Sequence, residues 1–407
     1  MNRIILIGNG FDLAHGLKTS YKDFINWYWD EWIKKLRISH SPVQSDELCQ
    51  FECKGSGTSW ITFFNTFFWQ TSPLNWVNVL EKINECSYTN IVQCTFLQNI
   101  CQSIEYNNWV DIEHEYYQLL TDVTHNPSKY DFTVKKLNEQ LIVLQTKLSE
   151  YLISQNSKEI RLKDNIKEKM FSTFKGCDIS IKRTNELKIH TKNLTRKREK
   201  DWELRLKKYD IDPKKLNNIM TAIFNIQHRN SNKYPEECYL PDSIMFLNFN
   251  YTNTAKLYLK EKSDFVLNHI HGNLDNPRSI IFGYGDELDD AYPEIKKRND
   301  NELLKNMKTI RYSETDNYRK MLSFIESAPY QIFIMGHSCG NSDRTLLNTL
   351  FEHDNCVSIK PFYHKKEDGT DNYIELVQNI SRNFTDMKKM RDRVVNKTYC
   401  EPLVGEK

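Results

Sequence analysis

The chain has 407 residues, of which 39% are hydrophobic and 27% are charged, and its formal net charge is +2. This composition is typical of a globular protein, and the small net charge excludes a strong overall field that would attract nucleic acid or an anionic membrane. No stretch approaches the ~18 consecutive apolar residues of a membrane-spanning helix, so we expect a cytoplasmic protein without a membrane partner. The ten cysteines include no Cys-x-x-Cys pair, which favours reduced thiols and argues against a structural zinc site.

The first segment predicts a strand, a glycine turn and a helix. The apolar run at residues 4–7 is typical of a strand covered on both faces, and Gly8, Asn9 and Gly10 follow it directly. Glycines let a backbone turn sharply and approach a phosphate, and a helix N-terminus attracts negative charge. The spacing differs from G-x-G-x-x-G because Gly16 comes six residues after Gly10, so a plain strand-to-helix turn is the alternative.

Helical periodicity dominates from about residue 33 to residue 240. Five aromatic residues recur at helical spacing and predict a helix whose aromatic face packs into a core, a binding surface being the alternative. A series of leucines predicts a second amphipathic helix. We interpret residues 33–240 as a mainly helical insertion. The aromatic series is Trp60, Phe63, Phe64, Phe67 and Phe68, and the leucine series is Leu137, Leu141, Leu144, Leu148 and Leu152.

A basic segment lies inside this insertion, at residues 182–208. It contains eleven lysines or arginines and four acidic residues. The simplest interpretation is a solvated helix face or a loop. The alternative is a surface that contacts phosphate backbones, although no nucleic-acid-binding motif accompanies the segment.

Strand patterns return after residue 240, separated in part by helical patterns. Strands that alternate with helices predict an α/β fold with a mostly parallel sheet, which the N-terminal strand would join. We therefore expect a split Rossmann-like domain made of residues 1–32 and 241–407. The predicted strands are 243–250, 265–271, 279–284, 331–335 and 357–363, and the predicted helices include 317–326, 343–351 and 373–384.

Polar residues follow two of these strands. Asn250 and Tyr251 come at the end of one apolar strand, and His271 at the end of the next. The carboxyl ends of parallel strands line the ligand crevice of such sheets, so an amide and an imidazole are well placed for a substrate. The alternative is a structural polar pair. His269 and His271 share a strand face, but no acidic third ligand stands at a telling spacing, so we predict no metal.

Residues 336–340 also end a predicted strand and match G-x-S-x-G, the nucleophile pattern of α/β-hydrolases. Too little chain follows Ser338 for the acid and histidine of that fold, residues 340–342 delay the next helix, and an upstream His-Gly-Gly-Gly segment is missing. We therefore predict a second glycine loop that contacts a nucleotide, with Ser342 or Asp343 capping the helix.

These motifs together resemble the AbiH family of phage abortive-infection proteins, which implies a role in antiphage defence. The resemblance extends over nearly the whole chain, with a divergent middle. Its blocks are Ile-Gly-Asn-Gly-Phe-Asp-Leu-Ala-His-Gly-Leu at residues 7–17, then Thr19-Ser20-Tyr21 and Phe24, Trp109-Val110-Asp111-Ile112-Glu113, Phe249-Asn250-Tyr251-Thr252, Ile270-His271-Gly272, and Gly336-His337-Ser338 with Asp343.

The same blocks are similar to a sirtuin-type nucleotide-binding domain. The spacing of Gly8, Gly10 and Gly16 matches its opening, Asn250 and His271 match its catalytic asparagine and histidine, and Gly336 with Ser338 matches its later loop. Asp12 departs from the usual serine, Lys18 departs from the usual proline, and the zinc-ribbon cysteines are absent, which argues against protein deacetylation. The resemblance implies that NAD or a related nucleotide contacts Gly8, Asn9, Gly10, Phe11, Asp12, Gly16, Tyr251, Gly336, His337, Ser338 and Asp343.

Our leading hypothesis is hydrolysis of the nicotinamide–ribose bond, with His271 as the base and Asn250 orienting the water or the ribose. Asp111 and Glu113 would contact ribose if the insertion caps the site, and would have no role as surface carboxylates. One alternative is a nucleotide-binding sensor whose insertion engages a phage component. Another is an effector that binds nucleic acid through residues 182–208. The nucleotide, the trigger and the oligomeric state are left open.

Overall fold

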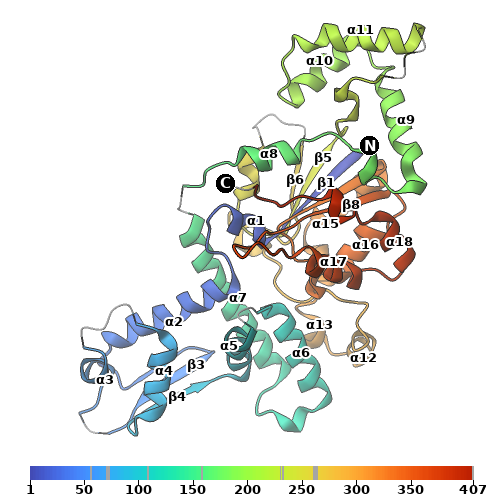
Figure 1. Ribbon diagram of the computed structural model, residues 1–407. Coiled ribbons are helices and arrows are strands. Elements are labelled where there is room, and N and C mark those ends of the chain that lie inside the picture. The colour runs from blue at the N-terminus through green and yellow to red at the C-terminus, as the bar shows by residue number, and fades with distance from the viewer. Residues whose placement is uncertain are drawn as a thin grey trace.

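In the computed structural model of the protein, a five-stranded parallel sheet lies at the centre of the molecule (Figure 1). The structure describes residues 1–55, 57–69, 74–107, 110–156, 159–229, 231, 233–259 and 265–405. A second sheet has three strands and is antiparallel. The five-stranded parallel sheet confirms the predicted α/β class with a mostly parallel sheet. In spatial order the parallel strands are β6 (Val266–His269), β5 (Ile244–Asn248), β1 (Asn2–Ile7), β7 (Tyr330–Met335) and β8 (Cys356–Phe362).

β1 is the middle strand and pairs with β5 on one side and with β7 on the other. Ile5, for example, lies opposite Phe246 and Phe333. All six residues of β1 are buried, as its continuous apolar run predicts. Along the chain these five strands take the spatial order 3-2-1-4-5, so the order reverses between β1 and β7. In doubly wound sheets this reversal marks the place where ligands bind.

Helices cover both faces of the sheet because successive strand residues point to opposite sides. On one face Ile4 and Leu6 of β1 pack with the helices of the last third of the chain. On the other face Ile5 and Ile7 pack with Phe11 and with the α8 helix. The first group is α15 (Asn317–Ser327), α16 (Arg344–Glu352), α17 (Tyr373–Arg382) and α18 (Met387–Arg393), and the second is α1 (Asn9–Ala14) and α8 (Asp164–Met170).

The strand predicted at residues 279–284 is wrong. The segment joins neither sheet. It passes over the carboxyl edge of the parallel sheet and makes only isolated backbone contacts there. The Ile281 N–H donates to the His271 carbonyl at 2.9 Å, and Tyr284 forms an isolated bridge with Met307. Ile280, Phe282 and Tyr284 are buried in the core of the α2–α7 lobe defined below, and Ile281 is buried in the core on one face of the parallel sheet, which explains the strand-like hydrophobicity of the segment without strand pairing.

The α2–α7 lobe contains the first part of the insertion together with helix α2, which begins earlier at Tyr21, and it lies below the parallel sheet in Figure 1. Its core confirms the predicted leucine face, because all five leucines of the series are buried. The predicted aromatic face is confirmed in part, because Trp60, Phe63 and Phe64 are buried and Phe68 is half-buried, whereas Phe67 is exposed. The lobe also contains the small antiparallel sheet. Its elements are α2 (Tyr21–Arg37), β2 (Val43–Ser45), β3 (Cys49–Cys53), α3 (Trp60–Phe67), α4 (Trp76–Glu85), β4 (Thr89–Gln93), α5 (Thr95–Asn107), α6 (Ile112–His125) and α7 (Val134–Asn156).

The last part of the insertion forms the α9–α11 lobe, which lies at the opposite end of the molecule in Figure 1. It has its own hydrophobic core around Trp202, Leu206 and Ile219. The insertion therefore contains two separate cores. None of the helices in the described ranges is long and apolar enough to cross a membrane. The α9–α11 lobe consists of α9 (Thr184–Leu194), α10 (Glu199–Lys208) and α11 (Lys215–His228). Three short helices from the last third of the chain pack near the other lobe, the α2–α7 lobe: α12 (Tyr292–Lys297), α13 (Asn301–Leu304) and α14 (Lys308–Arg311).

Candidate functional site

A cavity of about 1220 Å³ opens at the carboxyl edge of the parallel sheet. The loops after all five strands reach its wall, so it lies across the place where the strand order reverses. The α2–α7 lobe closes it from the other side through Tyr21, Asp111 and Leu148. The strand-end residues in the wall include Gly8 after β1, Phe249 after β5, His271 after β6, Gly336 after β7 and His364 after β8.

All of the predicted site residues except Phe11 and Gly16 lie in the cavity wall. Phe11 is fully buried in the apolar layer beneath the sheet, and Gly16 forms the turn that ends α1 with a φ of +81°. Asp111 and Glu113 both belong to the wall, where Glu113 is buried and Asp111 is half-buried. Trp109, which belongs to the AbiH-like blocks, lies outside the described residues.

The two glycine loops pack directly against each other. The Gly10 N–H donates to the Gly336 carbonyl at 2.8 Å. Gly336 has a φ of +78°, and a Cβ at this position would lie 2.1 Å from the Phe11 nitrogen. A Cβ on Gly8 would lie 2.5 Å from the His337 Cα. These glycines are therefore required where one backbone meets another, which is a reason for their presence that does not involve a ligand.

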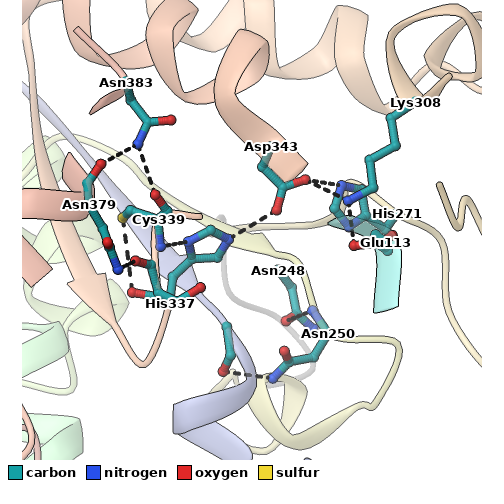
Figure 2. Close-up of polar contacts among 12 residues, drawn as sticks. Glu113, Asn248, Asn250, His271, Lys308, His337, Cys339, Asp343, Asn379 and Asn383 are labelled. Atoms are coloured by element: carbon teal, nitrogen blue, oxygen red, sulfur yellow. Dashed lines mark hydrogen bonds and ion pairs between the residues drawn. The ribbon is translucent and has the colours of Figure 1, made fainter. Parts of the chain in front are cut away.

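The Asp343 carboxylate is the centre of the site (Figure 2). Its Oδ1 lies 2.9 Å from Lys308 Nζ and 3.2 Å from His271 Nε2, and its Oδ2 lies 3.6 Å from His337 Nε2. The prediction that Ser342 or Asp343 caps the next helix is wrong, because no side-chain hydrogen bond caps α16. Asp343 occupies the position before the helix, but its side chain turns to the three cationic or imidazole partners instead.

His271 is held in one orientation by this carboxylate. Its Nε2 also lies 3.1 Å from the Tyr312 hydroxyl, and its ring stacks on Tyr312 and meets the Phe249 ring edge-on. Because a carboxylate only accepts, Nε2 carries the proton toward Asp343 and Nδ1 remains an acceptor. Across the described part of the chain, Nδ1 has no hydrogen-bond partner. Burial, with the Lys308 charge, lowers the pKa of His271, so the ring is neutral at pH 7.

Lys308 links Asp343 to the α2–α7 lobe. It is fully buried, and its Nζ lies 2.8 Å from Glu113 Oε2, while Glu113 Oε1 accepts the Gly283 N–H at 3.0 Å. Burial opposes the charge on Lys308, but the two carboxylates raise its pKa above the ordinary value. Burial raises the pKa of Glu113, and the neighbouring Lys308 opposes part of that rise, whereas Lys308 and His271 hold the pKa of Asp343 well below its usual range despite its burial.

Asp111 caps α6 beside the second glycine loop. Its Oδ1 accepts the N–H groups of Glu113 and His114, each at 3.1 Å. Its Oδ2 lies 3.8 Å from the place where a Cβ on Gly340 would stand. Burial raises the pKa of Asp111. The start of α6 thus brings two carboxylates from the insertion to the cavity.

Asn250 joins the end of β5 to the first glycine loop. Its Nδ2 donates to the Gly8 carbonyl at 3.0 Å, and its N–H donates to Asn248 Oδ1 at 3.1 Å (Figure 2). Tyr251 donates through its hydroxyl to the Ile281 carbonyl at 3.1 Å. These bonds fix the loop in which Asn250 faces the cavity.

The second glycine loop is held from behind by α17. Asn379 donates to the Ser338 carbonyl at 3.0 Å, and Asn383 donates to the Cys339 carbonyl at 2.9 Å (Figure 2). Cys339 adopts a φ of +57°, a conformation that these bonds help to maintain. In the described structure, no hydrogen bond connects the Ser338 hydroxyl to a histidine, so the loop lacks the contact that activates a serine nucleophile.

Three residues of the site were not predicted from the sequence. They match no motif, and only the structure shows that Lys308 contacts Asp343, that Tyr312 contacts His271 and that Asn248 contacts Asn250. Asn248 offered the clearest pattern, as a buried amide at the end of an otherwise apolar strand. Within the ranges that the structure describes, no three His, Cys, Asp or Glu side chains are placed to hold a metal ion.

The comparisons with known proteins agree with the blocks that carry this site. The model of the family described as Bacteriophage abortive infection AbiH matches residues 4–364. No curated protein and no solved structure matches the chain. The matched region includes both glycine loops, Asn250, His271 and Asp343. The chain therefore belongs to the AbiH family of bacteriophage abortive infection proteins.

Proposed function

We propose that this protein binds NAD or a related nucleotide in the cavity and hydrolyses its nicotinamide–ribose bond, which would deprive an infected cell of NAD. One observation carries the proposal: a buried His271, oriented by Asp343 and with Nδ1 free among the described residues, lies in the wall of a cavity that spans the reversal point of a doubly wound sheet.

The dimensions of the cavity support a dinucleotide. Adjacent strands lie about 4.8 Å apart, so the ends of β6 and β8, four spacings apart, are separated by about 19 Å. The cavity extends along this whole edge, with His271 at one end and His364 at the other. A dinucleotide lying across the strand ends would place its reactive ribose near His271 and its other half toward β8.

In the proposed reaction the bond from ribose C1′ to the nicotinamide nitrogen breaks, and the bonding electron pair leaves with nicotinamide. The oxygen of a water molecule bonds to C1′, and one proton of that water passes to Nδ1 of His271. Asp343 stabilises the imidazolium that results. Asn250, fixed against Gly8, would orient the water or the ribose.

The two carboxylates of the insertion, Asp111 and Glu113, differ in how many of their oxygens are already hydrogen-bonded within the protein. Glu113 is already engaged by Lys308 and Gly283, while Asp111 uses only Oδ1 to cap α6. Asp111 is therefore the better candidate for a hydrogen bond to a ribose hydroxyl.

Isothermal titration with NAD, ADP-ribose and ATP tests the binding step. We expect NAD or ADP-ribose to bind, and Asn250→Ala to abolish turnover and phage-dependent toxicity without unfolding the protein. Binding without nicotinamide release would instead identify a nucleotide sensor. No binding of the three nucleotides would refute the proposal.

A second candidate function is contact with nucleic acid through the α9–α11 lobe. Lys188, Lys192 and Arg196 follow one another at intervals of four residues along α9 and its end, and all three are exposed. Such a row fits a phosphate backbone. The salt dependence of binding to RNA or DNA tests it: neutralising the three residues should flatten the dependence, and an unchanged slope would remove this candidate.

A further inference from the structure

We infer that Asp12 is the contact for a ribose hydroxyl, so that a sugar rather than a phosphate lies over the first glycine loop. The inference rests on the proposed function, since it assumes that a nucleotide occupies the cavity. It adds the orientation of that nucleotide and the chemical group that the loop recognises.

Asp12 belongs to the cavity wall, and one of its carboxylate oxygens has no hydrogen-bond donor among the described residues. The residue lies in the first turn of α1 and is 1% exposed. Its Oδ2 accepts the Thr252 hydroxyl at 2.6 Å. Its Oδ1 is buried, and no group in the described chain donates to it in bonding geometry. A buried carboxylate oxygen without a donor is costly, so a ligand that supplies a donor would bind favourably there.

The surroundings of Asp12 do not suit a phosphate. The Gly8 N–H donates to the Met335 carbonyl at 3.3 Å, and the Gly10 N–H donates to the Gly336 carbonyl. These two amide hydrogens are already bonded to the carbonyls of Met335 at the end of β7 and of Gly336 in the second glycine loop, so a phosphate could not accept hydrogen bonds from them. A carboxylate would also repel the phosphate charge.

The same surroundings suit a hydroxyl. Burial raises the pKa of Asp12 to about 6, and the nearby Thr252, Thr254 and Asn250 offset part of that rise, so the carboxylate is largely ionised at pH 7. An ionised carboxylate accepts a strong hydrogen bond from a sugar hydroxyl. Thr252 belongs to the loop after β5, between the first glycine loop and the β6 end that carries His271. A ribose held by Asp12 would therefore lie on the His271 side of the cavity.

ADP-ribose and its 2′-deoxy and 3′-deoxy analogues, altered at either ribose, provide the test without turnover. Their dissociation constants are measured by calorimetry with the wild-type chain, with Asp12→Asn, and with Asp354→Asn as a matched control. The control removes the same charge from a side chain that is 91% exposed. Thermal unfolding of each variant verifies that it is folded.

We expect Asp12→Asn to weaken the binding of ADP-ribose by about 10-fold or more, because a hydrogen bond to a charged group is lost. Asp354→Asn should leave the dissociation constant unchanged. The deoxy analogue that lacks the contacted hydroxyl should bind the wild type more weakly than ADP-ribose does, by the same factor. It should bind Asp12→Asn with the same affinity as ADP-ribose does, because the contact is already lost in that variant. Equal losses for every analogue in both proteins, or full affinity in Asp12→Asn, would overturn the inference while leaving nucleotide binding intact. Failure of the wild type to bind would overturn the proposed function and this inference with it.

Discussion

Lys308 Nζ lies 2.8 Å from Glu113 Oε2, so a lysine from the last third of the chain is paired inside the protein with a carboxylate from the helical insertion. The same ammonium lies 2.9 Å from Asp343, which orients His271. The insertion is thereby connected to the candidate base by three consecutive contacts, the two ion pairs of Lys308 and the hydrogen bond between His271 and Asp343. Movement of α6 would change the electrostatic environment of His271 directly.

Replacing this lysine should destabilise the protein. In Lys308→Met the buried carboxylates of Glu113 and Asp343 lose their shared cation, and removing one partner of a buried ionic group costs about 3–5 kcal/mol. Adding Glu113→Gln should recover part of the loss. Lys305→Met is the control, because its pair with Glu302 is exposed and should contribute less than about 1 kcal/mol. Urea denaturation measures each value, and equal effects of the two lysine variants would contradict the ionic role of Lys308.

The titration of His271 should reflect both of its charged neighbours. Burial and Lys308 lower its pKa, so the ring should accept a proton only below the ordinary value of about 6.5. The base form is present above that pKa, and activity should therefore fall as pH falls through it. Lys308→Met should raise this pKa, and Asp343→Asn should lower it. NMR titration of the ring measures the shifts, and a wild-type pKa at or above 6.5 would be inconsistent with the environment described.

The contact between the glycine loops should make Gly336 much less tolerant of a side chain than Gly16. Both have positive φ, so alanine should cost about 1 kcal/mol at either position for the backbone conformation alone. At Gly336 the new Cβ would also meet the Phe11 nitrogen at 2.1 Å, whereas nothing lies within 4 Å at Gly16. Thermal unfolding should show a larger loss for Gly336→Ala, and equal losses would mean that the loops separate easily.

Much of the parallel sheet could be predicted because its five strands are apolar runs that stand out in the sequence. β1 is an apolar run bounded by glycine, and in a parallel sheet such a run has both faces covered. The position of His271 after one predicted strand and of Gly336 after another was enough to bring them to one edge, since parallel strands share that edge.

The remaining features depend on contacts that no local pattern encodes. The segment at residues 279–284 is as hydrophobic as a strand, but its partners are the α2–α7 lobe and the His271 carbonyl. The strands of the small sheet are short, and β2 is mostly exposed, so its sequence carries little periodicity. In the sequence Lys308 cannot be distinguished from a surface lysine, because the two carboxylates that pair with it lie 195 and 35 residues away along the chain.

Release of nicotinamide from NAD, followed by chromatography, tests the central claim most directly. The assay compares the purified wild type with His271→Ala, and cellular NAD is followed in phage-infected cells that express each form. We predict release and NAD loss with the wild type and neither with His271→Ala, although that variant should still bind ADP-ribose. Equal release from both proteins, or unchanged NAD with the wild type in both settings, would contradict the account.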